Sequence, residues 1–276
     1  MLDEREAPPG VDPRQPSAAR LYDYYLGGGT NFQVDVAAGE SLRAALPDLY
    51  DAAWANRGFH QRAARWMASD QNIDQFIDIG SGLPTQGNTH AAVGRVRPGA
   101  RVAYVDNDPM VHAMAAGLLS GDDQDTKLLE GDLRDPEDLL NNPGLRSLID
   151  LSQPVGLLMS AVVHFVADGS EPGKLVKRYT DALAPGSYLA LSHATADKLP
   201  ERSVQAMYDT YENANTLIYL RTRDQVRRLF DGLEMVEPYP DADDPITYVG
   251  LWGAESVEEA DSDGSRVLYC GVGKRL

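Results

Sequence analysis

The sequence predicts an α/β fold: a doubly wound, mostly parallel seven-stranded sheet with an antiparallel last strand, plus an N-terminal helical segment. Two observations support this class. Between residues 75 and 193, short apolar strands alternate with helical stretches, as in a parallel sheet covered by helices on both faces. Near the end of the chain, two strand-like segments, 233–237 and 266–273, follow each other without a predicted helix between them, so we expect them to pair in antiparallel fashion.

Each element rests on a local pattern. The expected parallel strands are apolar and span residues 75–79, 101–106, 126–131, 154–161 and 187–193. The expected helices between and after them span residues 84–96, 109–119, 136–149, 172–184 and 201–216. One more helix begins at Thr222, where Gln225 completes a capping box. The acidic stretch 255–265 is expected to be a mobile loop.

The chain divides into three parts. Residues 1–16 are rich in proline and charge, and we expect a flexible tail. Residues 17–70 are expected to form helices, the first of which is capped by Ser17 and ended by Gly27-Gly28-Gly29. Residues 71–276 are expected to form the α/β domain.

The charge balance limits the partners. The chain has 42 Asp or Glu and 25 Lys or Arg, which gives a formal net charge of −17. Such a surface repels phosphate groups, so we expect neither nucleic acid nor an anionic membrane as a partner. The dense basic cluster has helical spacing and is expected to form a solvated face. Its members are Arg221, Arg223, Arg227 and Arg228.

The sequence also bears on location and redox chemistry. A single cysteine, Cys270, excludes an internal disulfide framework and a cysteine-rich metal site. No run of about 18 apolar residues occurs, and the N-terminus lacks the basic start and apolar core of a signal peptide. We therefore expect a cytoplasmic protein.

The strongest functional signal follows the first expected strand, where the chain reads Asp78-Ile79-Gly80-Ser81-Gly82. Ligands of doubly wound sheets bind at the carboxyl ends of the strands, and glycines let the backbone approach them closely. A dinucleotide site needs Gly-x-Gly-x-x-Gly or Ala, but Thr85 takes the last position. A nicotinamide-dependent oxidoreductase is therefore disfavoured.

The loop instead resembles the signature of class I methyltransferases, in which an acid precedes the first glycine by two residues. In that family the loop lies along the methionine part of S-adenosylmethionine (SAM). The resemblance implies that four residues of the loop bind SAM. They are Asp78, Gly80, Ser81 and Gly82.

Three later strand ends fit the same cofactor. Asp106 ends the second expected strand, where a carboxylate can accept hydrogen bonds from ribose hydroxyls, and Asn107 is placed to lie along the adenine. The resemblance implies that Asp132 meets the adenine amino group and that Leu133 packs on the ring. Ser160, at the end of the fourth strand, is a further candidate cofactor residue.

From about residue 14 onward, the chain resembles the actinobacterial SAM-dependent methyltransferase family formerly described as a domain of unknown function. The resemblance rests on SAARLYDYYLGG at 17–28, NR at 56–57, DIGSGLPT at 78–85 and VDNDP at 105–109. It implies SAM as the cofactor and does not define the acceptor.

The resemblance also implies that residues 17–70 fold as a lid over the SAM pocket. The candidate contacts in this segment are Tyr22, Tyr25, Gly28, Asn31, Asn56 and Arg57. Arg57 is suited to pair with the carboxylate of the methionine part. The alternative is that Tyr22 and Tyr25 are core aromatics and that Arg57 is a surface residue.

Motifs of other methyltransferase chemistries are missing. After the fourth strand, residues 159–165 lack the Asp/Asn-Pro-Pro-Tyr/Phe motif of amino-group methylation, and no proline precedes Cys270 as in cytosine C5 enzymes. No acid ends this strand, so we expect no metal. The candidate general bases are His164 and His193, because histidine titrates near neutral pH, although a structural role for either stays open.

These patterns predict a SAM-dependent methyltransferase that acts on an unidentified small-molecule acceptor. The alternative is a SAM-binding sensor or interaction protein without transfer activity. A helix after the fifth strand supplies candidate residues for the acceptor pocket, which are Tyr208, Tyr211, Asn215 and Tyr219. No pattern indicates a particular oligomeric state.

Overall fold

A computed structural model of the chain describes residues 2, 7–84, 87–118 and 125–276. Within these residues, eight strands form one sheet in the order β3-β2-β1-β4-β5-β8-β6, and β7 pairs with β8 off this path. The strands are β1 (Gln75–Ile79), β2 (Arg101–Asp106), β3 (Thr126–Glu130), β4 (Gly156–Ser160), β5 (Tyr188–Ala194), β6 (Glu234–Met235), β7 (Thr247–Tyr248) and β8 (Leu268–Lys274). Strands β1 to β5 pair in parallel and β8 is antiparallel to its neighbours, which confirms the predicted fold class.

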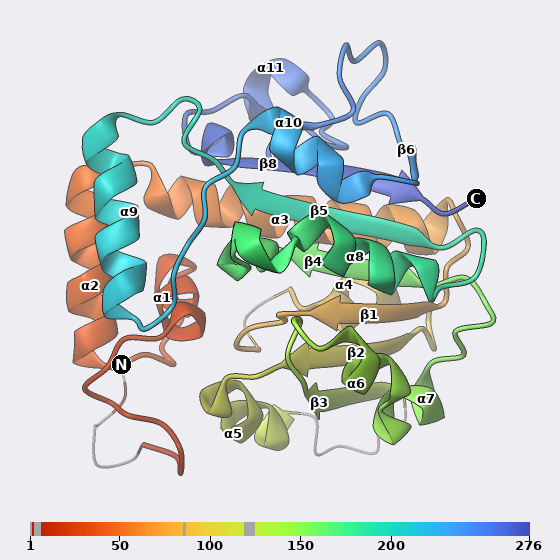
Figure 1. The fold of residues 1–276 in the computed structure, drawn as a ribbon, viewed down its shortest axis with the longest axis horizontal. Coiled ribbons are helices and arrows are strands. Elements are labelled where there is room, and N and C mark those ends of the chain that lie inside the picture. The colour runs from red at the N-terminus through yellow and green to blue at the C-terminus, as the bar shows by residue number, and fades with distance from the viewer. Residues whose placement is uncertain (1, 3–6, 85–86, 119–124) are drawn as a thin grey trace.

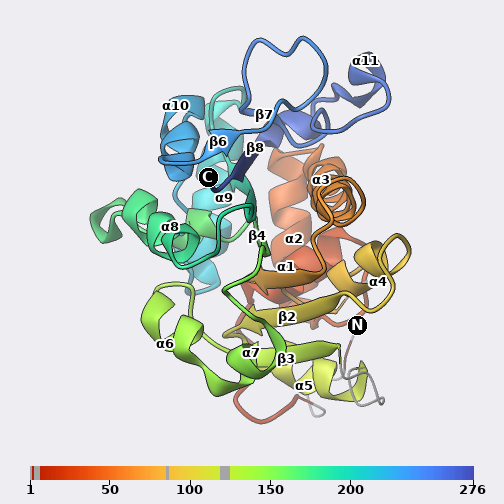
Figure 2. The same cartoon turned by 90° about the vertical axis from the view of Figure 1, so that its right-hand side faces the viewer.

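Helices cover both faces of the sheet (Figures 1 and 2). On one face lie α3 (Leu49–Ser69) and α4 (Thr89–Gly94), and on the other lie α6 (Pro136–Asn141), α7 (Pro143–Leu148), α8 (Pro172–Asp181) and α10 (Arg223–Arg227). Side chains alternate along β1, so Phe76 packs in the core with α3, whereas Ile77 and Ile79 pack in the core of the opposite face. Asp78 consequently faces α3 and α4.

The N-terminal helices lie beyond the carboxyl ends of the parallel strands (Figure 1). Here α1 (Ala18–Tyr25), α2 (Gln33–Ala45) and α9 (Glu201–Asn213) pack together. Ser17 caps α1 by accepting a hydrogen bond from the Arg20 backbone N–H at 3.2 Å, as predicted. Gly27, with φ of +77°, ends this helix in the left-handed conformation that favours glycine.

Two helix predictions need correction. The helix expected over residues 84–96 begins only at Thr89, because Gly87 has φ of +78° and Asn88 is not helical. Residues 83, 84, 87 and 88 are therefore not helical, and Thr85 lies outside the described residues. The helix expected over 136–149 is divided into α6 and α7, because Pro143 disfavours a helical conformation for the residue before it.

The C-terminal part contains more structure than expected. The predicted antiparallel pairing is confirmed between β6 and β8. Between them lie β7 and a helical turn, α11 (Val257–Ala260), which falls inside the acidic stretch expected to be a loop. In the described part of the chain, no helix is long and apolar enough to span a bilayer.

The prediction of a solvated arginine face is wrong for Arg221, which is 3% exposed. Its guanidinium donates to the backbone carbonyls of Val163 and Val166, and it forms an ion pair with Asp168 at 2.7 Å. Arg221 therefore links the segment after β4 to the segment before α10 through hydrogen bonds and an ion pair. Helical spacing was misleading because Arg221 precedes the first residue of α10.

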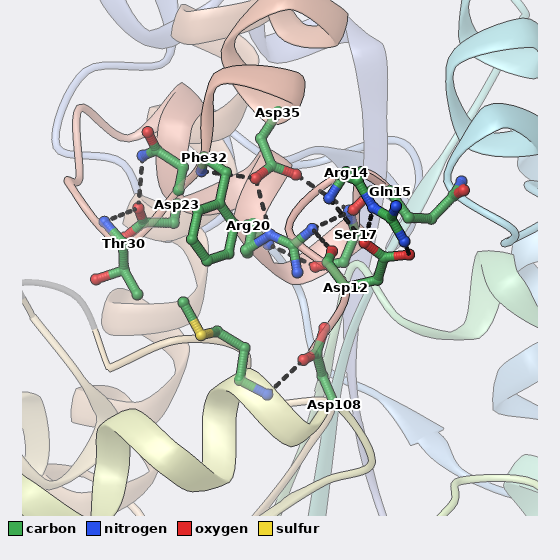
Figure 3. A network of polar contacts seen from close by, with 12 residues as sticks. Asp12, Arg14, Gln15, Ser17, Arg20, Asp23, Thr30, Phe32, Asp35 and Asp108 are labelled. Atoms are coloured by element: carbon green, nitrogen blue, oxygen red, sulfur yellow. Dashed lines mark hydrogen bonds and ion pairs between the residues drawn. The ribbon is translucent and has the colours of Figure 1, made fainter. Parts of the chain in front are cut away.

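A buried ion pair fastens α1 to α2 (Figure 3). Arg20 Nε lies 2.8 Å from Asp35 Oδ2, and the two side chains are 3% and 0% exposed. Asp35 also accepts hydrogen bonds from the backbone N–H groups of Phe32 at 2.8 Å and Ser17 at 3.2 Å. These bonds matter because a charge is stable in a protein interior only when it is fully paired.

The described part of the tail joins the same network. Arg20 donates to the Gln15 carbonyl, and the Gln15 side chain donates to the carbonyl of Asn213 at the end of α9. Val11 packs on a small apolar cluster that contains Phe32. The tail therefore crosses from the start of α2 to α9, and its flexibility stays a prediction.

We expect Arg20→Met to lower the free energy of unfolding by about 3–5 kcal/mol, because it leaves Asp35 buried without its partner. Urea denaturation measures this loss. The exposed pair of Arg43 and Glu40 on α2 provides the control, and Arg43→Met should change stability little. Equal effects of the two substitutions would contradict a stabilising role for the buried pair.

Candidate functional site

A cavity of about 570 Å³ opens at the carboxyl ends of the parallel strands. Its wall combines the ends of β1 to β4 with α1, α3, α9 and the segment after α9. This volume lies within the range of small-molecule sites. The cavity therefore occupies the place that the doubly wound topology assigns to a ligand.

The glycine loop after β1 forms one edge of the cavity. Gly80 and Gly82 have φ of +70° and +66°, which favours glycine at both positions. A Cβ atom on Gly80 would lie 2.3 Å from Cγ2 of Val162, so the loop runs directly against the segment after β4. Around Gly82 the space is open. Bare backbone is thereby presented to the cavity, and Ser81 lines it as well.

Asp106 fits a ribose. It is 9% exposed, and its two carboxylate oxygens accept hydrogen bonds from the backbone N–H groups of Asp108 at 2.9 Å and Gly82 at 2.8 Å. A carboxylate has about four acceptor positions, so these bonds leave capacity for a hydroxyl group. Burial raises the pKa of Asp106 above the ordinary range of aspartate.

Asp132 follows β3, and its carboxylate has a partner, Arg134, that the sequence did not indicate. Arg134 donates to its carboxylate, with Nε 2.8 Å from Oδ1, and Asn107 Nδ2 lies 3.2 Å from Oδ2. The hydrogen bond from Arg134 is the main cause that lowers the pKa of Asp132. Leu133, which is 8% exposed, also lines the cavity, so this end combines polar and apolar groups as an adenine requires.

From α3, Asn56 and Arg57 reach the cavity. Asn56 Nδ2 donates to the Tyr22 hydroxyl at 2.8 Å, and Ser192 Oγ donates to Asn56 Oδ1 at 2.5 Å. The Arg57 guanidinium lies 5.6 Å from the centre of the Tyr22 ring, and Arg57 is 8% exposed. Arg57 and Tyr22 therefore belong to the cavity wall, and the interpretation of Arg57 as a surface residue is wrong.

Gly28 does not reach the cavity, which corrects its placement among the cofactor residues. A Cβ atom on Gly28 would lie 2.1 Å from Asp23 Oδ1. Asn31 donates to Asp23 at 3.0 Å and to the Gly28 carbonyl at 2.9 Å, and it also lies outside the wall. Gly28 and Asn31 instead close the turn after α1 around the buried Asp23.

The second candidate base, His193, is 0% exposed and does not line the cavity. Its Nδ1 lies 2.8 Å from the Ala194 carbonyl, and its Nε2 accepts from Arg221 at 2.7 Å. Burial is the main cause that lowers its pKa to about 3. Both ring nitrogens form hydrogen bonds within the protein, so neither can take a proton from a ligand, which argues against His193 as a general base.

His164 lines the cavity, but the nitrogen that could accept a proton is already hydrogen-bonded to the protein backbone. Its Nδ1 accepts from the backbone N–H of Ala194 at 3.3 Å, so in the neutral ring the hydrogen is on Nε2. Burial lowers the pKa of His164 well below the ordinary range of histidine. The ring can donate a hydrogen bond to a ligand, and the expected role as a base needs correction.

A third histidine, which the sequence analysis missed, lies between the two ends of the cavity. His60 is 4% exposed, with Nδ1 2.9 Å from Ser160 Oγ and Nε2 2.7 Å from Thr89 Oγ1. Thr89 in turn donates to Asp78 Oδ2 at 2.6 Å. One signal could have identified it: on α3, His60 follows Asn56 by one helical turn and therefore lies on the same face.

The wall beyond the strand ends is uncharged. Tyr211, Asn215 and Tyr219 line it as expected, whereas Tyr208 is 37% exposed and lies outside it. Tyr25 also lines it, together with residues that the sequence did not indicate, which include Phe165, Met207 and Ile218. The charged side chains found in the described part of the wall all belong to the end formed by β1 to β3, α3 and the loops that follow the strands.

This fold and this site define a class I SAM-binding α/β domain. Residues 4–276 match the S-adenosyl methyltransferase family, and the chain belongs to it. A putative methyltransferase from Thermobifida fusca YX is 36% identical with a TM-score of 0.89, and the match covers 98% of each chain. A DUF574 family protein from Streptomyces avermitilis MA-4680 is 35% identical with a TM-score of 0.88, over 96% of this chain and 99% of that one.

More distant comparisons show the fold alone. The structure of OxaC in complex with SAH and oxaline is 15% identical with a TM-score of 0.50, over 80% of this chain and 47% of that one. No curated protein matches the sequence. The family confirms the predicted function: the chain is a SAM-dependent methyltransferase with SAM as its cofactor, and nothing in the comparisons supports the sensor alternative.

We expect Gly80→Ala to weaken binding of S-adenosylhomocysteine (SAH), the demethylated product, much more than Gly82→Ala. Both substitutions strain a left-handed residue by about 1–2 kcal/mol, but only the Cβ atom at Gly80 also collides with Val162. Calorimetric titration with SAH measures the difference. Equal losses would show that the contact with Val162 does not shape the loop.

We expect Asp106→Asn to weaken SAH binding by about 1–3 kcal/mol, because a ribose hydroxyl loses its charged acceptor. The affinity of the unaltered protein should fall with decreasing pH. Because burial raises the pKa of Asp106, this carboxylate takes up its proton at a higher pH than an exposed aspartate as the solution is acidified. Calorimetry across the acid range should show this loss for the unaltered protein and a flatter profile for the Asn variant.

Proposed function

We propose that the chain transfers the methyl group of SAM to a small, uncharged acceptor with an aromatic part. Bound SAM supplies a methyl group on a positively charged sulfur, which a nucleophile can attack. The observation that carries the proposal is the uncharged wall beyond the strand ends, to which Tyr25, Phe165 and Tyr211 contribute aromatic rings. Asn215 offers polar contacts there, and the net charge of −17 disfavours nucleic acid.

The proposal assigns the charged end of the cavity to SAM. The cofactor residues keep the roles expected from the sequence: the glycine loop for the methionine part, Asp106 for the ribose, and Asp132 with Leu133 for the adenine. The position of Arg57 in the wall supports its pairing with the methionine carboxylate. Asn107 completes this set as a partner of Asp132.

We also propose that residues 17–70 are an added segment on the SAM-binding domain, residues 71–276, and that its first part, α1 and α2, acts as a lid, because α3 packs on the sheet. Ser17 and Tyr22 of this segment line the cavity, which supports such a role. A closed lid excludes water, and methyl transfer needs this because water competes as a nucleophile. We retain the proposal of cytoplasmic residence, with which the buried free thiol of Cys270 is consistent.

Calorimetry tests the cofactor first: SAM and SAH should bind, and NADH should not. The SAH complex is then titrated with 1-naphthol and with 1-naphthoate, which has a similar ring but carries a negative charge. We expect the naphthol to bind at least about tenfold more tightly, because the uncharged wall cannot pair a carboxylate. A preference for the naphthoate would refute the uncharged acceptor. Incubation of labelled SAM with fractionated extract then identifies the natural acceptor.

A further inference from the structure

A buried chain of hydrogen bonds crosses the wall between the two ends of the cavity. It runs from Ser160 Oγ to His60 Nδ1 over 2.9 Å, from His60 Nε2 to Thr89 Oγ1 over 2.7 Å, and from Thr89 Oγ1 to Asp78 Oδ2 over 2.6 Å. The four residues come from β4, α3, α4 and β1. Ser160, His60 and Asp78 line the cavity, whereas Thr89 is 0% exposed and does not.

The chemistry of the four groups fixes the direction of each hydrogen bond. An ionised Asp78 can only accept, so Thr89 donates to it and accepts the hydrogen of His60 Nε2. The lone pair of the neutral imidazole is then on Nδ1, where it accepts the hydrogen of Ser160. Ser160 has thus used its only hydrogen, and toward the cavity its oxygen can only accept.

Ser160 also lies where the two ends of the cavity meet. In the β4–β5 pairing it is the partner of Ser192, which is bonded to Asn56 and through it to Tyr22. The next two residues along the chain, Ala161 and Val162, line the cavity, as does Phe165 of the uncharged wall. A nucleophile placed between the glycine loop and this wall therefore has Ser160 as a neighbour.

We propose that Ser160 receives the proton of the methyl acceptor and passes its own proton to His60 in the same step. This inference rests on the proposed function. The heteroatom of the acceptor forms a bond to the methyl carbon while the carbon–sulfur bond breaks, and the electron pair of that bond stays on sulfur. The acceptor proton moves to Ser160 Oγ, the Ser160 proton moves to His60 Nδ1, and the positive charge lost from sulfur appears on the imidazole.

Thr89 and Asp78 act as positioning residues in this scheme. Through Thr89, the carboxylate holds Nε2–H in place and stabilises the imidazolium that forms, because Asp78 Oδ2 lies 3.6 Å from His60 Nε2. Two charged groups act on His60: Asp78 raises its pKa and Arg57 lowers it. Burial outweighs both and lowers the pKa of His60, which favours the neutral imidazole with an unprotonated Nδ1.

A pair of matched probes tests the proton transfer. 1-Naphthol is largely protonated in neutral water and needs a base, whereas 1-naphthalenethiol is largely ionised and does not. We expect His60→Gln, which keeps a donor for Thr89 but has no basic nitrogen, to slow methylation of the naphthol about a hundredfold and to leave that of the thiol nearly unchanged. Equal losses for both probes, or no loss, would overturn the proposal.

Substitutions of Thr89 separate the relay from simple packing. Thr89→Val removes the link to Asp78, and Thr89→Ser keeps it. The first should therefore lower kcat for the naphthol by more than it weakens SAH binding, and the second should retain kcat. His90→Asn is the control, because His90 is the next residue, bonds to Tyr104 instead and does not line the cavity. Thermal unfolding confirms that each variant is folded.

A measurement without turnover gives an independent test. NMR of protein with ¹⁵N-labelled histidine and bound SAH reports which ring nitrogen carries hydrogen. At neutral pH the hydrogen of the His60 ring should be on Nε2, and Nδ1 should be unprotonated. A hydrogen on Nδ1 would falsify the relay whatever the acceptor is. If SAH binds but neither naphthalene probe does, it is the proposed acceptor class that fails, and the state of His60 still decides the relay.

Discussion

The site depends on one constraint: α3 lies against the sheet with polar side chains on its buried face, and each must find a partner there. An unpaired buried polar group costs several kcal/mol. Asn56 is paired with Ser192 of β5, and His60 is paired with Ser160 of β4 and Thr89 of α4. These bonds fix α3 relative to the ends of the strands and thereby define the wall from which the cavity is built.

The two ends of the cavity differ in physical character, and this separates their tasks. Carboxylates and two arginines line the end of the cavity that contains the glycine loop. Two of the carboxylates, Asp106 and Asp132, accept hydrogen bonds from backbone or side-chain donors. Such fixed groups suit a cofactor that carries charges and hydroxyls. The opposite wall offers rings and aliphatic groups, which bind by shape and burial. Ser160 lines the same cavity, at the position that the proposed transfer requires.

The fold and the cofactor end could be predicted because their signals are local. The loop at Asp78 and the carboxylate of Asp106 follow strands that short apolar patterns reveal, and parallel topology brings their ends together. Hydrogen bonds between side chains that are far apart in the sequence have no local pattern from which they could be predicted. Arg221 was assigned to a helix surface, although carbonyls more than fifty residues earlier in the chain bind it. His60 was missed for the same reason, since its partners lie 29 and 100 residues away.

The three histidines near the cavity show that neighbours, and not position along a strand, decide what a histidine can do. His193 lies near the end of β5 and His164 follows β4, positions that predict catalysis, yet a guanidinium and a backbone N–H, respectively, occupy their basic nitrogens. At His60 the partner of Nδ1 is a hydroxyl, which can exchange its proton with a ligand, whereas neither an arginine nor an amide can. A relay to the cavity is therefore available only where the basic nitrogen is bonded to a group that both donates and accepts, and among these three residues that is His60.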